Sequence, residues 1–211
     1  MYLLVLFGVL VSTYLMVVAK RMPALIRSFR YQSFFLFLLT LIIAVHEQHM
    51  ELYIVAALLF ILKVGVIPYF LYRIIDDIKP DENLGLFINA QLSLLCALAF
   101  MYVSWIFTAF VFSPVSALRA MVPAAAFFMV LVGIFLMVGR MTALAQVVGI
   151  LAMENGLFLL ASTVAGGMPF FVEIAIFFDV FVSVVIMGFF VYRISKLFTH
   201  IDVNKLSRLK G

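Results

Sequence analysis

Long apolar segments, separated by short polar ones, follow one another along almost the whole chain. A helix that crosses a bilayer needs about 20 mainly apolar residues. Seven segments meet that requirement, at residues 2–19, 31–47, 52–74, 85–111, 119–139, 142–165 and 169–192. The second can begin earlier, near Met22, because proline is well tolerated in a first helical turn. The pattern predicts an all-α membrane protein with seven transmembrane helices.

Composition supports this prediction and excludes several other classes of protein. Hydrophobic residues make up 67% of the chain and charged residues 11%, whereas average soluble chains carry roughly 25% charged residues. The single Cys96 excludes an internal disulfide, and no set of Cys and His residues has metal-ligand spacing. The net charge of +4 is better explained by positively charged cytoplasmic loops than by nucleic-acid binding, which we do not expect.

The distribution of basic residues predicts the orientation of the chain. With the N-terminus outside, 12 of the 14 Lys and Arg residues fall in the inner loops and tail, which is the usual asymmetry. Arg119 lies outside, and Lys63 lies within a span. We therefore expect the C-terminus to be cytoplasmic.

Two short motifs recur along the chain and predict an internal repeat. The sequence LMVVAKRMPAL at 15–25 is similar to LMVGRMTAL at 136–144, and LYRI at 71–74 is similar to VYRI at 191–194. Spans 1–3 and 5–7 would then be parallel copies, although a basic residue after an apolar run is also easily matched by chance. The predicted divisions are a three-helix unit (1–83), a connecting helix (84–117), a second three-helix unit (118–195) and a basic cytoplasmic tail (196–211).

Four charged residues fall inside the predicted spans and away from their ends, and a charge at the bilayer centre costs at least about 2.5–3.5 kcal/mol. They are Lys63, Glu154, Glu173 and Asp179. From the rise of 1.5 Å per residue, Lys63, Glu154 and Asp179 are expected near the midplane, with Glu173 about 9 Å nearer the outer surface. Buried acids and a lysine at one depth favour a lateral proton-transfer path, supported by the polar Asn155 and Ser183. The alternative is a buried ion pair that only fixes helix packing.

The C-terminal half carries a family resemblance. Residues 147–159 (VVGILAMENGLFL), 167–169 (GMP) and 173–179 (EIAIFFD) resemble component E of the hydrogenase-4 type membrane-bound hydrogenases. Residues 140–193 are also similar, more distantly, to the K-type subunit of respiratory complex I and the C subunit of multisubunit cation/proton antiporters. The K-type resemblance implies that Glu154 and Asp179 serve a lateral proton path, with Glu154 about one helical turn beyond the position of the K-type acid, which is Leu151 here. Lys63 and Pro68 resemble the K-x-x-x-x-P segment of antiporter-like subunits.

The resemblance implies a non-catalytic membrane subunit of a group-four [NiFe] hydrogenase, a formate hydrogenlyase or a related complex I-like machine. No cofactor is expected in this chain, and the iron–sulfur clusters and [NiFe] centre would lie in partner subunits. The expected partners are antiporter-like and complex I H-type-like membrane subunits, a peripheral redox arm, and the lipids of a bacterial or archaeal cytoplasmic (inner) membrane. Two alternatives remain: a subunit of a multisubunit cation/proton antiporter, and a purely structural membrane spacer.

Overall fold

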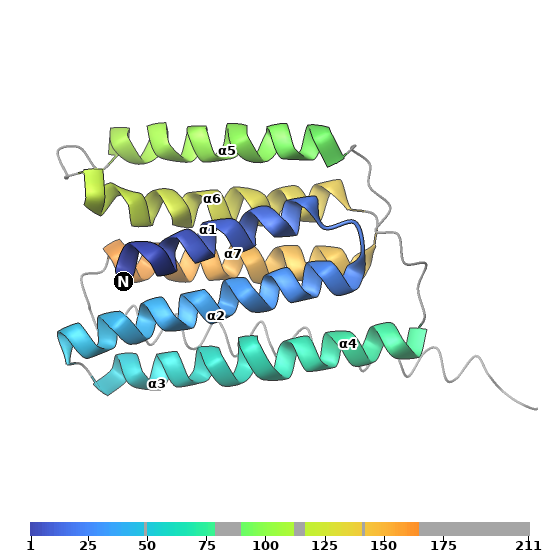
Figure 1. The fold of residues 1–211 in the computed structure, drawn as a ribbon, viewed down its shortest axis with the longest axis horizontal. Helices are drawn as coiled ribbons and strands as arrows, with labels where there is room; N and C mark the ends of the chain where they lie inside the picture. Colours follow the sequence, from blue (N-terminus) through green and yellow to red (C-terminus); the bar gives the residue numbers. More distant parts are fainter. Residues whose placement is uncertain (49, 79–89, 112–116, 141, 165–211) are drawn as a thin grey trace, which may run out of the picture. The chain divides into compact units, whose positions relative to one another are not determined.

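The computed structural model describes residues 1–48, 50–78, 90–111, 117–140 and 142–164, and this part of the chain contains helices and no strands (Figure 1). All of the described helices belong to one compact unit, Met1–Ile176. In chain order they are α1 (Tyr2–Val18), α2 (Met22–Glu47), α3 (Met50–Leu58), η1 (Leu59–Val66), α4 (Ile67–Ile78), α5 (Ala90–Val111), α6 (Ala117–Gly139) and α7 (Ala143–Val164).

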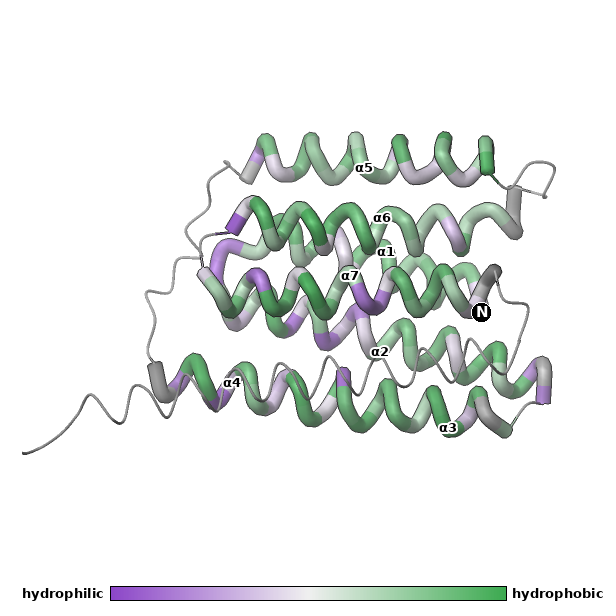
Figure 2. Tube along the Cα trace, turned by 180° about the vertical axis from the view of Figure 1, so that it is seen from behind, coloured by the Kyte–Doolittle hydropathy of each residue, from purple (hydrophilic) through white to green (hydrophobic). Residues whose placement is uncertain are grey.

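Five of the helical segments in the described residues are long and apolar enough to cross a membrane. They are Met22–His46, Leu52–Asp76, Gln91–Val111, Ala120–Gly139 and Ala143–Ser162, and the apolar α1 is shorter. Figure 2 shows the same helices as mainly hydrophobic along their length, with hydrophilic residues at only a few interior positions. The chain is therefore a multi-pass membrane protein. The predicted seventh span, 169–192, and the basic tail lie outside the described residues.

Two of the predicted spans differ in detail from the structure. Helix α2 begins at Met22, rather than at 31, and has Pro23 in its first turn. Proline favours this position because its missing N–H would have no helical partner there. The third span is longer than predicted and combines α3, η1 and α4, with the π-helix η1 in its middle. A π-helix leaves no simple mark in the hydrophobic pattern, so the sequence did not indicate it.

The helices pack into a core formed mainly by α1, α2, η1, α6 and α7. Helix α6 packs closely against α7, α1 packs against α2, and α2 also contacts η1 and α7. Val9, Leu39, Leu59 and Met129 belong to the buried apolar cluster between these helices. Helix α5 contacts α6 and α1 and leaves most of its large apolar side chains exposed, as suits a helix that faces lipid or another subunit.

Candidate functional site

Lys63 lies in the middle of the π-helix η1, in the interior of the helix bundle. Its side chain is 1% exposed, and it is among the largest fully buried side chains of the described residues. At the end of η1 the Ile67 N–H donates to the Leu62 carbonyl, five residues earlier, which is the wider turn of a π-helix. Such segments are rare and are frequently found at functional sites, because they change the direction in which one or two side chains point.

Glu154 and Asn155, which are adjacent residues of α7, both contact the side chain of Lys63. The Lys63 Nζ lies 3.6 Å from a carboxylate oxygen of Glu154 and donates a 2.9 Å hydrogen bond to Asn155 Oδ1. Glu154 is 2% exposed and Asn155 is fully buried. An isolated charge would be very costly in such a place, and the two opposite charges together with the amide reduce that cost.

A chain of hydrogen bonds continues from Asn155 into α2. The Asn155 Nδ2 group donates to Gln32 Oε1 at 3.1 Å and to Ser33 Oγ at 3.0 Å. Gln32 Nε2 donates in turn to Thr13 Oγ1 of α1 at 2.8 Å, and Thr13 Oγ1 donates to the Val9 carbonyl at 2.7 Å. The polar chain, which we define as Lys63, Asn155, Gln32 and Thr13, therefore crosses the bundle and connects η1, α7, α2 and α1.

Glycine residues set the close approach of α6 and α7 beside this site. A Cβ atom on Gly133 would lie 2.6 Å from the Met153 nitrogen and 2.7 Å from the Gly149 carbonyl oxygen. A Cβ atom on Gly156 would lie 2.8 Å from the Ala126 carbonyl oxygen. Small residues allow the backbones of membrane helices to approach in this way. The contacts at Gly149, Met153 and Gly156 flank Glu154 and Asn155 on both sides and fix their position against α6.

Arg140 is a second buried cation, at the turn between α6 and α7. Its side chain is 1% exposed, and its Nη2 atom donates to the Val17 carbonyl at 2.9 Å and to the Met16 carbonyl at 3.5 Å. These carbonyls belong to the last turn of α1, where no later helical N–H is available to them. Burial lowers the pKa of Arg140 to about 10, so the guanidinium remains charged at neutral pH. It therefore caps the negative end of the α1 dipole.

The structure brings together three of the six candidate site residues. Lys63, Glu154 and Asn155 form one cluster, whereas Glu173, Asp179 and Ser183 lie outside the described residues. Sequence reasoning missed Gln32, Ser33 and Thr13. Gln32 was visible as an amide inside an apolar segment, and that was the available signal. The residues that the structure describes contain no group of three or more His, Cys, Asp and Glu side chains that could hold a metal ion.

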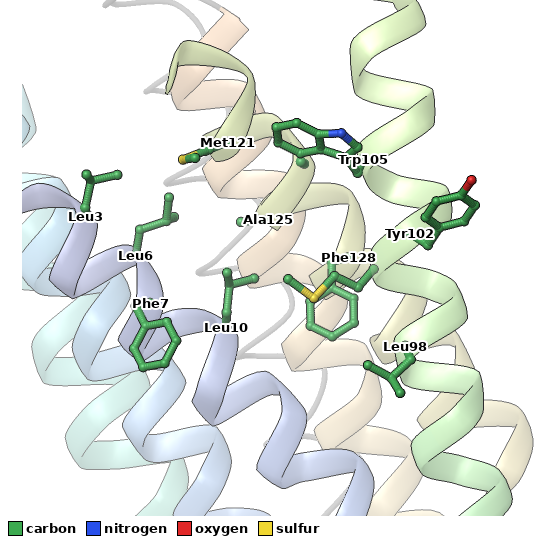
Figure 3. Close-up of a pocket in the computed structure, with 12 residues that line it drawn as sticks. Leu3, Leu6, Phe7, Leu10, Leu98, Tyr102, Trp105, Met121, Ala125 and Phe128 are labelled. Atoms are coloured by element: carbon green, nitrogen blue, oxygen red, sulfur yellow. The ribbon is translucent and has the colours of Figure 1, made fainter. Parts of the chain in front are cut away.

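A separate apolar pocket lies between α1, α5 and α6 (Figure 3). Its volume is about 500 Å³, and it is lined by Leu3, Leu6, Phe7, Leu10, Leu98, Met101, Tyr102, Trp105, Met121, Ala124, Ala125 and Phe128. None of these residues belongs to the polar chain. The pocket therefore offers mainly apolar surface, with Tyr102 and Trp105 as its residues that carry a polar group.

Comparisons with known proteins give two kinds of relative. Hydrogenase-4 component E of Escherichia coli K12 is 32% identical to this chain over 166 residues, which cover 76% of this chain and 74% of that protein. The uncharacterized protein Rv0085 of Mycobacterium tuberculosis is 24% identical over 204 residues, which cover 96% of this chain and 93% of that protein. No protein-family model and no solved structure matches the sequence.

Proposed function

This chain belongs to the hydrogenase-4 component E family, and from that premise we propose that it is a non-catalytic membrane subunit of a hydrogenase-type complex. The iron–sulfur clusters and the [NiFe] centre of such a complex would lie in its partners. This role requires three kinds of partner: antiporter-like membrane subunits, complex I H-type-like membrane subunits, and a peripheral redox arm. The membrane would be the cytoplasmic membrane of a bacterium or archaeon.

Within that complex, the chain would contribute a lateral proton-transfer path that includes Lys63 and Glu154. The observation that carries this proposal is the buried contact of 3.6 Å between the ammonium and the carboxylate. Each of these groups can bind or release a proton, and a change of charge in a neighbouring subunit would shift the balance between them. Asp179 and Glu173 would continue the path, as their sequence positions suggest, with Ser183 as a supporting polar group.

The test removes each titratable group and measures assembly and proton transport separately. Glu154→Gln, Lys63→Met and Asp179→Asn are introduced singly into the full chain in its host. Assembly is followed by native gel electrophoresis, and hydrogen turnover and the proton gradient are followed in inverted membrane vesicles with a pH-sensitive dye. We expect Glu154→Gln and Lys63→Met to assemble and to reduce the gradient roughly 10²-fold, as expected for loss of a positioned proton-transfer group.

A matched control is available on α2. Thr40 is buried, and its hydroxyl donates to the Leu36 carbonyl of the same helix at 3.0 Å. Thr40→Val therefore removes a buried hydroxyl group without breaking a hydrogen bond between two helices. This variant should retain both assembly and the gradient. If Glu154→Gln and Lys63→Met also retain both, the chain is a structural spacer and the proton path is wrong. Copurification without any iron–sulfur protein would instead support an antiporter subunit.

A further inference from the structure

The direction of every hydrogen bond in the polar chain follows from the chemistry of Lys63. A charged lysine can only donate hydrogen bonds, so the group of Asn155 that faces it must be the carbonyl oxygen. The amide nitrogen of Asn155 must then face α2, where it needs acceptors and finds Gln32 Oε1 and Ser33 Oγ. Gln32 must in turn present its nitrogen to Thr13.

The far end of the polar chain fixes the same direction independently. Thr13 donates its hydroxyl hydrogen to the Val9 carbonyl, which can only accept, and this leaves the Thr13 oxygen as an acceptor for Gln32. Lys63 at one end of the polar chain and Thr13 at the other each permit one direction of hydrogen bonding. Together they determine the orientations of the Asn155 and Gln32 amide groups. All of the donors point from η1 toward α1, an arrangement in which neighbouring hydrogen bonds strengthen one another.

We propose that Gln32 is a positioning residue, which holds the Asn155 carbonyl oxygen toward Lys63 and thereby sets how the Lys63–Glu154 pair holds its proton. This inference rests on the proposed proton path. Gln32 itself does not touch the ion pair and exchanges no proton. It acts through Asn155, whose amide nitrogen donates to Gln32 Oε1 and to Ser33 Oγ, so Gln32 is one of the two acceptors on α2 that hold the Asn155 oxygen toward Lys63.

The consequence concerns the balance between the two charged groups. The fixed Asn155 oxygen accepts a hydrogen bond from the Lys63 ammonium, and the same ammonium lies 3.6 Å from a carboxylate oxygen of Glu154. Without Gln32, both contacts weaken, and Glu154 should bind a proton at higher pH. Helix α7 presents the charged Glu154 to Lys63, and α2 contributes the uncharged Gln32 and Ser33, which accept hydrogen bonds from Asn155.

The experiment measures the protonation of Glu154 directly, so that it does not depend on identifying the redox reaction. The complex is purified in mild detergent, and the infrared band of the protonated carboxyl group is assigned by its loss in Glu154→Gln. The pH at which half of Glu154 is protonated is then measured for the parent chain, Gln32→Leu, Asn155→Leu and the double variant. The loss of one hydrogen bond to a charged group corresponds to a shift of about one pH unit.

The double variant distinguishes positioning from simple packing. If Gln32 acts through Asn155, Asn155→Leu shifts the half-protonation pH by about one unit, and Gln32→Leu shifts it upward by less, because Ser33 Oγ still accepts from Asn155. Gln32→Leu then adds no further shift in the Asn155→Leu background. Thr40→Val should cause no shift. Additive shifts, or no shift in Gln32→Leu, would overturn the positioning role while leaving the proton path intact. Retention of the proton gradient in Glu154→Gln would overturn the path itself.

A milder variant covers the case in which Gln32→Leu does not assemble. Thr13→Val keeps the shape of the side chain and removes only the oxygen to which Gln32 Nε2 donates. Gln32 then loses one of the two hydrogen bonds that fix the orientation of its amide group. The half-protonation pH of Glu154 should therefore rise by less than one unit. An assembled Thr13→Val protein with no shift would contradict the proposal.

Discussion

The two buried cations of the described residues, Lys63 and Arg140, are stabilised by different chemical groups. Lys63 lies in the middle of a span and meets a carboxylate and a side-chain amide. Arg140 lies at a turn between helices and meets main-chain carbonyls of α1. The last carbonyls of a helix have no helical donor, so a cation placed there needs no acidic side chain. In the middle of a helix the carbonyls are used by the helix itself, and a buried cation must be balanced by side chains.

This difference separates the site to which we assign proton transfer from one that holds a fixed charge. The Lys63–Glu154 pair consists of an ammonium and a carboxylate 3.6 Å apart, two groups between which a proton can be exchanged in the path proposed above. Arg140, with a pKa of about 10, keeps its charge at neutral pH and faces carbonyls that do not titrate. We therefore regard Arg140 as an anchor of the α1–α2 and α6–α7 turns, and Lys63 as the cation with a chemical role.

The largest expected effect follows from removing one member of the Lys63–Glu154 pair. Glu154→Leu leaves a buried ammonium without its carboxylate and should lower the free energy of unfolding by about 3–5 kcal/mol. Lys63→Met combined with Glu154→Leu replaces both charges with apolar groups and should recover most of that loss. Unfolding of the purified chain in mild detergent, followed by circular dichroism, gives the four corners of the double-mutant cycle. A loss in the double variant equal to the sum of the losses in Glu154→Leu and Lys63→Met would show that the pair does not interact.

A smaller effect is expected at Arg140. Arg140→Met removes the 2.9 Å hydrogen bond to the Val17 carbonyl but leaves no opposite charge behind, so the loss should be about 1.5–3 kcal/mol. The Arg140 Nη1 atom is buried without a hydrogen-bond partner, and its removal offsets part of the loss. The same unfolding measurement applies. A loss as large as that of Glu154→Leu would contradict the distinction between the two cations.

Gln146→Ala is the matched control for Arg140. The Gln146 side chain is exposed and donates to the Arg140 main-chain carbonyl at 3.2 Å, so it touches the same residue without touching the guanidinium. Its replacement should change the free energy of unfolding by less than about 0.5 kcal/mol. Arg140 precedes α7, and Glu154 lies 11 residues beyond the first residue of α7, Ala143, which is about 16 Å along the helix, so the effects at Arg140 and Glu154 should add.

The two cations also differ in how far the sequence could predict them. The apolar pattern indicated the membrane spans, and the helical rise placed Lys63 and Glu154 at a similar depth, where the structure brings them into contact. Gln32, Ser33 and Thr13 could not be assigned to the same site, because which faces of α1, α2 and α7 meet depends on side-chain packing. Arg140 was interpreted as an ordinary cytoplasmic loop charge, and the structure buries it because α1 ends against the α6–α7 turn.

The last prediction concerns the close contact between α6 and α7 at Gly133, which positions the partners of Lys63 but not those of Arg140. A Cβ atom on Gly133 would meet the Met153 nitrogen at 2.6 Å, directly before Glu154, so Gly133→Ala must push α7 away from α6 at this level. Overpacking of this kind costs about 1–3 kcal/mol. The same displacement moves Glu154 and Asn155 relative to Lys63, and it should therefore reduce the proton gradient by more than the loss of stability alone explains.

Gly65→Ala is the corresponding control on the other side of the ion pair. A Cβ atom at Gly65 would have the Phe60 carbonyl oxygen, at 3.8 Å, as its near neighbour, which is an ordinary van der Waals distance. This variant adds the same methyl group two residues from Lys63 without forcing two helices apart, so both stability and the gradient should be retained. If Gly133→Ala lowers stability but leaves the gradient per assembled complex unchanged, the close approach of α6 and α7 serves packing alone. The geometry of the Lys63 site would then tolerate a displacement of α7. We expect the contacts of Arg140 with α1 to tolerate the same displacement.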